Sequence, residues 1–256
     1  MGGTTLTARN WATGSSNAIH HDDVAARLGF GGGLVPGVGL FAYLVAPAVE
    51  AFGADWLGHG RLEARFEKPV YDGEEVTASL LDDGAVCLCG PDGDVRATGS
   101  AGTDPAPPPD PAAFPAPAPP DPRPVADDVA WPSGTALGAM GWTFSERKRE
   151  DHLERLGQGD LPWLPPATAH PGHLIELANE VLVANVAMGP WIHTGSAVSL
   201  HRPVTEGQHV EVRALVADTR ERKGNRHVDL DVLVLADGEP ALSGRHSATY
   251  RLAERG

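Results

Sequence analysis

The sequence predicts an α+β protein made of two similar halves. Segments in which apolar and polar residues alternate are separated by turns rich in Gly and Asp, which is the pattern of antiparallel strands. Each half also contains one long, mostly apolar helical segment. Residues 63–73 correspond to residues 197–207 at an offset of 134, and Pro36-Gly37 corresponds to Pro171-Gly172 at an offset of 135. Two landmarks at nearly one spacing indicate an internal repeat.

The first half opens with polar side chains that are capable of catalysis. Asn17, His20 and Asp22 fall in an irregular segment just before a short helix that is predicted over residues 24–28. Asp22 or Asp23 is a suitable N-cap for this helix, because a carboxylate accepts hydrogen bonds from the first free N–H groups. These side chains are therefore the first candidates for a functional site.

A glycine-rich turn and an apolar helix follow. Residues 30–33 contain three consecutive glycines and must form a turn. Residues 34–46 are apolar nearly all round, with Pro36 and Gly37 where a helix would begin. A helix that is apolar on every side has to be buried, so we expect this one at the centre of the first half.

Three alternating segments predict the sheet of the first half. They cover residues 60–66, 75–80 and 85–89, and turn residues at 82–84 separate the last two. The pattern ends near Ala101, so the first domain is assigned to residues 1–102. Residues 103–124 are dominated by Pro, Ala and Asp with almost nothing to bury, which predicts an extended linker. The second domain is assigned to residues 125–256.

The second half repeats the pattern without the polar motif. A mostly apolar helix is predicted over residues 174–184, and alternating strands over 210–216 and 228–234, joined by a charged bend at 220–225. Residues 145–156, which precede the helix, contain no counterpart of Asn17, His20 and Asp22. We therefore expect one site, in the first half, and a structural role for the second half.

Composition limits the function classes. The 256 residues carry a formal charge of −14, which argues against nucleic acid or an anionic membrane as the main partner. No leader segment and no apolar run long enough to span a membrane is recognised in the sequence. Cys87 and Cys89 would share one face of a strand, which is poor geometry for a mutual disulfide. Reduced thiols predict a cytoplasmic protein.

Three stretches carry a resemblance to a known family. They read N-A-I-H-H-D-D from Asn17, G-F-G-G-G-L-V-P-G from Gly29 and R-F-E-K-P-V-Y-D-G-E-E-V from Arg65. These stretches resemble the MaoC-like hydratases and dehydratases, whose pattern is roughly D-x-N-P-[IL]-H-x-D, then G-[FY]-x-x-[PV]-[VI]-x-[HP]-G, then R-F-x-x-P-V-x-x-G-[DE]. Three positions depart from it: Ser15 replaces the family's catalytic Asp, Ala18 its Pro, and Pro36 the His often found before the glycine.

The resemblance implies a double hot-dog fold, in which each half is a curved antiparallel sheet wrapped around a central helix. It implies hydration of 2-enoyl thioesters, or dehydration of 3-hydroxyacyl thioesters, bound to CoA or an acyl carrier, without a cofactor or a metal. His20 would be the acid/base, Asn17 would position its loop, and the N–H of Gly37 would polarise the thioester carbonyl. The other substrate-binding candidates are Pro36, Val38 and Asp22. We expect a monomeric pseudo-dimer or a homodimer.

Ser15 is the departure that matters for chemistry. A hydroxyl has a pKa far above neutral and cannot replace a carboxylate as a base. Three interpretations follow: His20 works alone, Asp22 or Asp23 supplies the carboxylate, or the site binds acyl thioesters without hydrating them. The enzyme class, provisionally a lyase, depends on which holds.

Other classes of function are also open. A non-catalytic acyl-thioester binding module keeps the same fold, and Ser15 favours it. A thioesterase commonly needs a carboxylate near the central helix, where Glu50 is the only nearby acid in the first half. The run from His20 to Asp23 is not assigned to a metal, because consecutive side chains point in different directions. His170 and His173 are interpreted as core or surface histidines, and the basic residues near Arg220 as a solvated hairpin.

Overall fold

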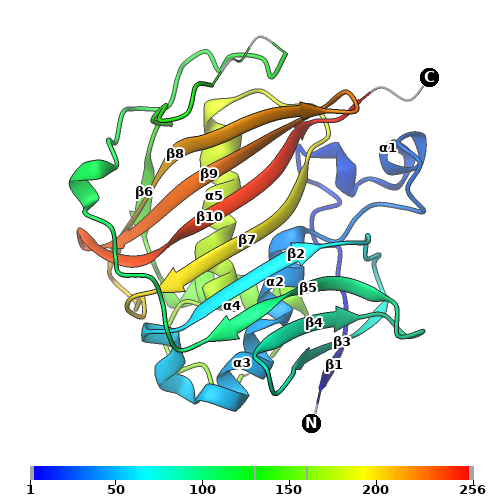
Figure 1. The fold of residues 1–256 in the computed structure, drawn as a ribbon, viewed down its shortest axis with the longest axis vertical. Helices are drawn as coiled ribbons and strands as arrows, with labels where there is room; N and C mark the ends of the chain where they lie inside the picture. The colour runs from blue at the N-terminus through cyan, green and yellow to red at the C-terminus, as the bar shows by residue number, and fades with distance from the viewer. Residues whose placement is uncertain (1–2, 128, 130, 160, 254–256) are drawn as a thin grey trace.

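The computed structural model describes residues 3–127, 129, 131–159 and 161–253, which form one ten-stranded antiparallel sheet with helices on one side of it (Figure 1). The strands are β1 (Thr4–Thr7), β2 (Arg61–Phe66), β3 (Glu75–Leu80), β4 (Ala85–Cys89), β5 (Val95–Gly102), β6 (Met140–Thr143), β7 (Ile192–Leu200), β8 (His209–Arg222), β9 (Asn225–Ala236) and β10 (Glu239–Arg251). The helices are α1 (Asp22–Arg27), α2 (Gly37–Tyr43), α3 (Val45–Phe52), α4 (Glu146–Leu156) and α5 (Pro171–Asn185), with short 3-10 helices η1 (Ala18–His20), η2 (Ala54–Gly58) and η3 (Pro111–Ala113). None of the described helices is long and apolar enough to cross a membrane.

The sheet confirms the predicted repeat. Its strand order is β1-β3-β4-β5-β2 in the first half, and β6-β8-β9-β10-β7 repeats that order in the second. The halves join where β2 pairs with β7, and there Glu63 lies opposite Ala197. The 134-residue offset makes these two residues equivalent, so a pseudo-twofold axis passes between them. Joining the two sheets removes one exposed strand edge from each half.

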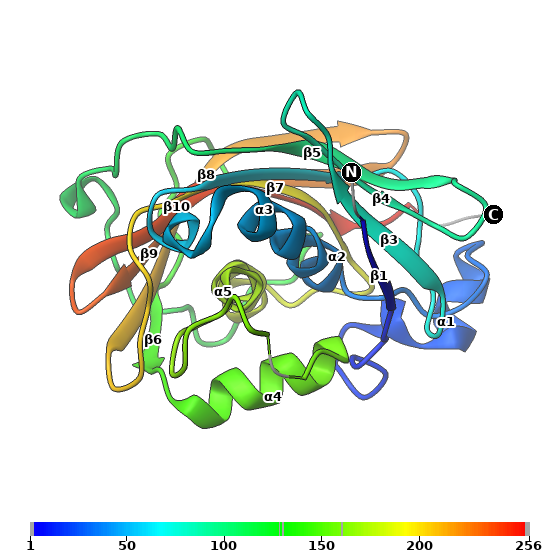
Figure 2. The ribbon, with the colours of Figure 1, turned by 90° about the horizontal axis from the view of Figure 1, so that it is seen from below.

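Two central helix segments lie side by side beneath the sheet (Figure 2). The predicted helix over residues 34–46 is divided in the structure: α2 ends at Tyr43 and α3 begins at Val45. The break follows from Pro47, which lacks an N–H and whose ring would clash with the carbonyl of Tyr43 four residues earlier. The second helix, α5, is continuous. A Cβ at Gly172 would lie 2.5 Å from Cβ of Ala42, so a glycine lets α5 approach α2 closely.

The region before α5 forms a helix that we did not predict. In α4, Ser145 is the N-cap and Gly157 ends the helix at a φ of 71°. Most of α4 is charged, but Arg149, His152, Leu153 and Leu156 are buried. Their spacing of three to four residues places them on one face, which packs beneath α5 (Figure 2). A polar helix is therefore held by a narrow buried stripe.

The Pro- and Ala-rich segment 103–124 connects the two halves. We expected it to bury almost nothing, but Phe114 is buried against Leu233 and Leu235. The guanidinium of Arg213 donates hydrogen bonds to the carbonyl oxygens of Pro111 and Phe114 at 3.1 and 3.2 Å. One aromatic side chain and one arginine thus hold this part of the segment against the second half.

The charged bend that we predicted over residues 220–225 is shorter in the structure. Strand β8 runs to Arg222 and β9 begins at Asn225, so only Lys223 and Gly224 form the turn. Both have positive φ, 51° and 76°, as a two-residue type I′ turn requires. The predicted central strands β3 and β4 and the helix α5 are confirmed, whereas β8 and β9 are longer than their alternating segments. Cys87 and Cys89, both on β4, are free.

Candidate functional site

A cavity of about 800 Å³ lies between the two halves. Its walls come from the segment before α1, the start of α2, the end of β2, α5 and the start of β7. This volume lies within the range of pockets that bind small organic ligands. The lining residues used below are Ser15, Asn17, His20, Pro36, Gly37, Val38, Lys68, Arg123, Arg155, Glu176, Asn179, Glu180, Trp191 and His193. Every residue predicted for the site except Asp22 therefore borders one cavity.

Both ring nitrogens of His20 have a hydrogen-bond partner, a short one at Nδ1 and a long one at Nε2. Its Nδ1 lies 2.7 Å from the carbonyl oxygen of Leu34, so Nδ1–H donates there and Nε2 carries a lone pair. Nε2 lies 3.3 Å from Nδ2 of Asn17. Burial lowers the pKa of His20, and His21 lowers it further, against the opposing effect of the Leu34 carbonyl. The ring is neutral at pH 7 and can accept a proton.

Asn17 links the two halves. Its Nδ2 donates to the carbonyl oxygen of Trp191 at 3.0 Å, and its Oδ1 accepts from the N–H of Trp191 at 3.1 Å. Oδ1 also accepts from the N–H of Ile19, which caps η1. The residue that contacts Nε2 of His20 is thus fixed by the backbone of the second half.

Replacement of Asn17 by Ala is expected to destabilise the fold by about 1–3 kcal/mol, because it leaves buried backbone groups of Trp191 without partners. The loop that carries His20 would also lose its attachment to the second half. Urea unfolding of Asn17→Ala beside Ser16→Ala, a change at an exposed neighbour, measures this effect. Equal stabilities of the two variants would contradict the linking role.

Ser15 borders the cavity, but Asp22 does not. Oγ of Ser15 donates to the carbonyl oxygen of Asn17 at 3.3 Å. Oδ1 of Asp22 accepts from the N–H of Gly33 at 2.8 Å and so holds the glycine turn rather than capping α1, whose N-cap is His21. A Cβ at Gly33 would lie 2.2 Å from the carbonyl oxygen of His20, which explains the need for glycine there.

Pro36, Gly37 and Val38 form the wall at the start of α2. The first N–H groups of a helix have no partner within the helix and remain available to a ligand. A Cβ at Gly37 would lie 2.9 Å from both Nδ1 of His193 and Cε2 of Phe66, so only glycine fits between these rings.

A row of polar residues on α5 was missed in the sequence. Glu176, Asn179 and Glu180 line the cavity, and their spacing of three and four residues places them on one face of the helix. Burial raises the pKa of Glu180, and the charge of Glu176 raises it further. The signal was present as three polar residues that interrupt an apolar helix, but the second half had been assigned a structural role only.

His193 is the other missed residue. It lies on β7, stacks on His246 with ring centroids 4.3 Å apart, and shares Ser196 with it through contacts of 2.9 and 3.1 Å. Nδ1 of His193 is buried without a hydrogen-bond partner among the described residues. Burial lowers the pKa of both rings, that of His246 to about 3, so both are neutral.

The buried histidines predict a loss of stability in acid. Burial also lowers the pKa of His170, whereas an unfolded histidine titrates near about 6.5. The stability of the folded protein is therefore unaffected by these histidines above about pH 6.5. Below that pH it decreases, until the pH reaches the pKa that each histidine has in the folded protein. Each such group lowers the free energy of unfolding by about 1.4 kcal/mol per pH unit in that window.

Urea unfolding between about pH 7 and pH 4 measures this dependence. His246→Gln is expected to reduce the slope by one histidine, and His59→Gln, at an exposed site, to leave it unchanged. An unchanged slope in His246→Gln would contradict the assignment.

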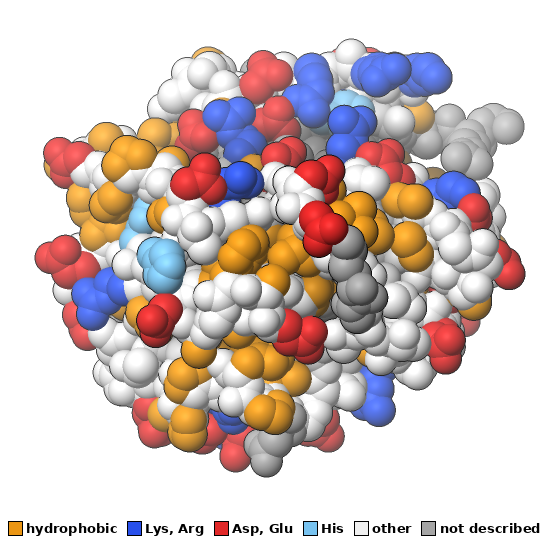
Figure 3. Space-filling model, turned by 60° about the horizontal axis from the view of Figure 1, so that its bottom comes forward, with side chains coloured by type: hydrophobic (Ala, Val, Ile, Leu, Met, Phe, Trp, Pro, Cys, Tyr) orange, Lys and Arg blue, Asp and Glu red, His pale blue; other side chains and the backbone are white. Residues whose placement is uncertain are grey.

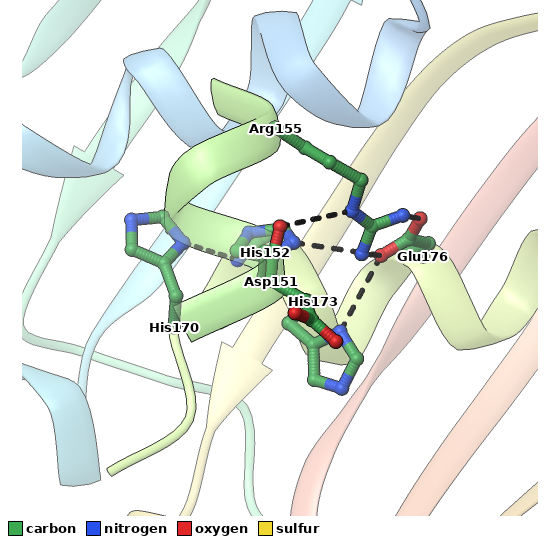
Figure 4. Close-up of polar contacts among 7 residues, drawn as sticks. Asp151, His152, Arg155, His170, His173 and Glu176 are labelled. Carbon is green, nitrogen blue, oxygen red and sulfur yellow. Dashed lines mark hydrogen bonds and ion pairs between the residues drawn. The ribbon is translucent and has the colours of Figure 1, made fainter. Parts of the chain in front are cut away.

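A second polar cluster lies at the α4–α5 contact (Figure 4). We call His152, Arg155, His173 and Glu176 the α4–α5 cluster. Arg155 donates to Oε1 and Oε2 of Glu176 at 2.7 and 3.1 Å, and Nδ1 of His173 and of His152 lie 3.4 and 3.5 Å from Oε2. Burial alone would raise the pKa of Glu176, but these partners outweigh it and hold the pKa well below its usual range. Glu176 is therefore ionised.

Charge is unevenly distributed over the surface. On the face shown in Figure 3, most Lys and Arg side chains lie near the upper edge, whereas acidic side chains are spread among hydrophobic patches. Inside the cavity, Lys68 and Arg123 are lining cations. Lys68 is paired with Asp94 at 2.9 Å, and Arg123 donates to the carbonyl oxygen of Val183 at 2.8 Å, so Arg123 is the one of these two cations without a carboxylate partner among the described residues.

Neither a family model nor a curated protein matches the sequence. Solved structures do match. A MaoC-domain protein from Chloroflexus aurantiacus assigned as a dehydratase aligns with a TM-score of 0.67 at 14% identity, over 99% of this chain and 94% of that one. A conserved hypothetical protein from Mycobacterium tuberculosis with a double hotdog fold aligns at 0.60 and 14%, over 96% and 93%.

The chain has a double hot-dog fold. A protein from Lactobacillus plantarum assigned as an oleoyl thioesterase is also similar to it, with a TM-score of 0.53 at 11% identity over 98% of this chain and 96% of that one. The double hot-dog fold implied by the sequence motifs is therefore confirmed. Because dehydratases and a thioesterase share it, the fold alone does not decide the reaction.

Proposed function

We propose that this double hot-dog protein is a MaoC-like hydratase or dehydratase that acts on 2-enoyl or 3-hydroxyacyl thioesters, with His20 as the acid/base. The observation that carries the proposal is the basic Nε2 of His20 at the edge of a cavity between the halves. Nδ1 donates to Leu34, so the lone pair is on Nε2, and its one partner among the described residues is the amide of Asn17 at the long distance of 3.3 Å. The motif around Asn17 and His20 and the shared fold of MaoC-like dehydratases give it further support.

The reaction needs one group that accepts and returns a proton. Neutral Nε2 of His20 takes a proton from water, whose oxygen forms a bond to the β carbon of the enoyl thioester, and the resulting imidazolium gives the proton to the α carbon. Negative charge develops on the thioester oxygen between these steps, and a backbone N–H at Gly37 is the donor that the resemblance assigns to it. Dehydration is the reverse sequence.

The cavity suits an acyl thioester in two further respects. Its walls are supplied by both halves, so the second half widens the space that the first would enclose alone. Arg123 is a local cation that a phosphate-bearing carrier such as CoA would need, and Lys68 would have to exchange its ion pair with Asp94 to join it. Because Ser15 provides no carboxylate, His20 would perform the proton transfers without the partner that the family pattern supplies.

Thioester hydrolysis is the second candidate function. The carboxylates of Glu176 and Glu180 favour it, since both border the cavity from a central helix. Glu50, considered from the sequence, is instead exposed and accepts a hydrogen bond from Thr4. Of the two acids on α5, Glu180 is free of the ion pair that holds Glu176, and it is the better base.

One assay distinguishes these functions. The ultraviolet absorbance of a short 2-enoyl-CoA is followed together with the release of free thiol. Loss of absorbance without thiol supports hydration, whereas thiol release supports a thioesterase. Binding of the thioester with neither change supports a non-catalytic module and contradicts the proposal.

The pH profile supplies an independent test of His20. Because burial lowers its pKa, the base form persists below the ordinary histidine range, and kcat/KM for hydration is expected to fall only as the pH drops below about 6.5. Initial rates measured across this range give the apparent pKa of the acidic limb. An apparent pKa above about 7 for the acidic limb would indicate that a group other than His20 limits the reaction.

A further inference from the structure

We propose that His152, His173 and Glu176 form a binding site for a tetrahedrally coordinated divalent ion of the zinc class. Metal-binding atoms of these three side chains all lie within 4.8 Å of one another. The sequence did not predict this site, because His152 precedes His173 by 21 positions and only the packing of α4 on α5 brings them together. The inference does not depend on the reaction proposed above.

The two distances from the carboxylate oxygen to the imidazole nitrogens are close to those of tetrahedral coordination. Oε2 of Glu176 lies 3.5 Å from Nδ1 of His152 and 3.4 Å from Nδ1 of His173. Ligand atoms about 2.0–2.1 Å from a tetrahedral zinc ion lie about 3.3 Å from one another. His173 and Glu176 are three residues apart on α5 and share one face, the arrangement by which helices present histidine and carboxylate ligands.

Hydrogen bonding within the protein leaves these histidines incompletely satisfied. His152 is 1% exposed and His173 6% exposed. Among the described residues, neither ring nitrogen of His152 has a hydrogen-bond partner, and Nε2 of His173 has none. A buried polar group without a partner is destabilising, and most such groups in folded proteins have one. An ion bound between the two Nδ1 atoms would give Nδ1 of His152 the partner that it lacks and would take the place of the long contact between Nδ1 of His173 and Glu176.

Arg155 holds the carboxylate of Glu176 in place but does not use all the lone pairs of its two oxygen atoms. Its shorter contact, 2.7 Å, is to Oε1, and its contact to Oε2 is 3.1 Å. A carboxylate has about four lone-pair positions, so the side of Oε2 that faces the imidazoles can still bind an ion. Figure 4 shows Arg155 and the two imidazoles approaching Glu176 from different directions. Such outer-shell partners commonly fix the orientation of a metal ligand.

The fourth coordination position would be supplied from the cavity. Glu176 and Arg155 both line the cavity, whereas the two histidines do not. Water or an oxygen atom of a bound ligand can therefore complete the shell. The ion would fasten the polar helix α4 to the central helix α5 beside the space where substrate is proposed to bind.

The full chain is stripped with a chelator, dialysed and titrated with Zn²⁺ by calorimetry, with metal content measured afterwards and thermal unfolding followed in parallel. We expect one equivalent per chain and a higher unfolding midpoint with Zn²⁺. Co²⁺ in place of Zn²⁺ should give the intense visible absorption of a tetrahedral ion. These readouts need no enzymatic activity.

Matched variants locate the site. His152→Gln and Glu176→Gln are expected to weaken binding at least tenfold, whereas Glu180→Gln, which removes the same charge one turn further along α5, should bind as the wild type does. Should a ligand variant fail to fold, the wild-type titration decides. Wild-type protein that binds less than about 0.2 equivalents, or binds equally well after a folded ligand substitution, overturns the proposal.

Discussion

Replacement of His20 by Gln is expected to lower kcat/KM for enoyl-thioester hydration by about 10²–10⁴-fold. The glutamine amide occupies the Nε2 end of the ring, so it can keep the contact with Asn17 but not the bond from Nδ1 to the carbonyl oxygen of Leu34. What the variant lacks is the basic Nε2 that accepts a proton from water. The loss of activity is measured by quenching the reaction of a short enoyl-CoA at fixed times and quantifying the hydrated product.

The matched control is His59→Gln, which makes the same chemical change at an exposed histidine outside the cavity. Its rate should equal that of the wild type. Binding of a non-reactive acyl-CoA to His20→Gln should remain within about threefold of wild type, because a base that acts only in the chemical step contributes little to ground-state binding. A His20→Gln variant that hydrates at the wild-type rate would remove His20 from the mechanism.

The double architecture could be predicted from the sequence because the residues that form turns and helix starts recur at the same spacing in both halves. The correspondence of residues 63–73 with 197–207 marks β2 and β7 together with the turns that follow them, and the Pro-Gly pairs mark the starts of α2 and α5. These positions are set by turn and helix-end geometry, which a sequence shows directly. The pairing of Glu63 with Ala197 then follows from the twofold relation of the halves.

The composition of the cavity could be predicted only in part. Ser15, Asn17, His20 and Gly37 lie close in sequence, so one motif contains them. A cleft shared by the two halves is expected from the tandem fold, but a linear pattern does not show that Glu176, Glu180 and His193 of the second half point into it. The α4–α5 cluster has the same cause: it exists because a charged helix packs against an apolar one.

Replacement of Ser15 by Asp is expected to raise the rate of hydration more than tenfold if His20 works without a partner carboxylate. Ser15 borders the same cavity as His20. Its hydroxyl donates to the carbonyl oxygen of Asn17, which lies between Ser15 and His20 in the sequence. A carboxylate there would supply the second acid/base that the family pattern contains. It would also stabilise the protonated imidazole, so the acidic limb of the pH profile should move to higher pH.

Ser15→Asn separates these effects, because asparagine has nearly the size of aspartate but neither its charge nor its basicity. We expect Ser15→Asn to show no gain in rate and no shift of the pH profile. A gain with both variants would mean that side-chain size at position 15, not basicity, limits the reaction. If neither variant changes the rate, the reaction does not need a carboxylate at position 15. Glu180→Gln then tests whether α5 supplies the second carboxylate. Loss of activity in Glu180→Gln would show that the reaction uses a carboxylate from the second half.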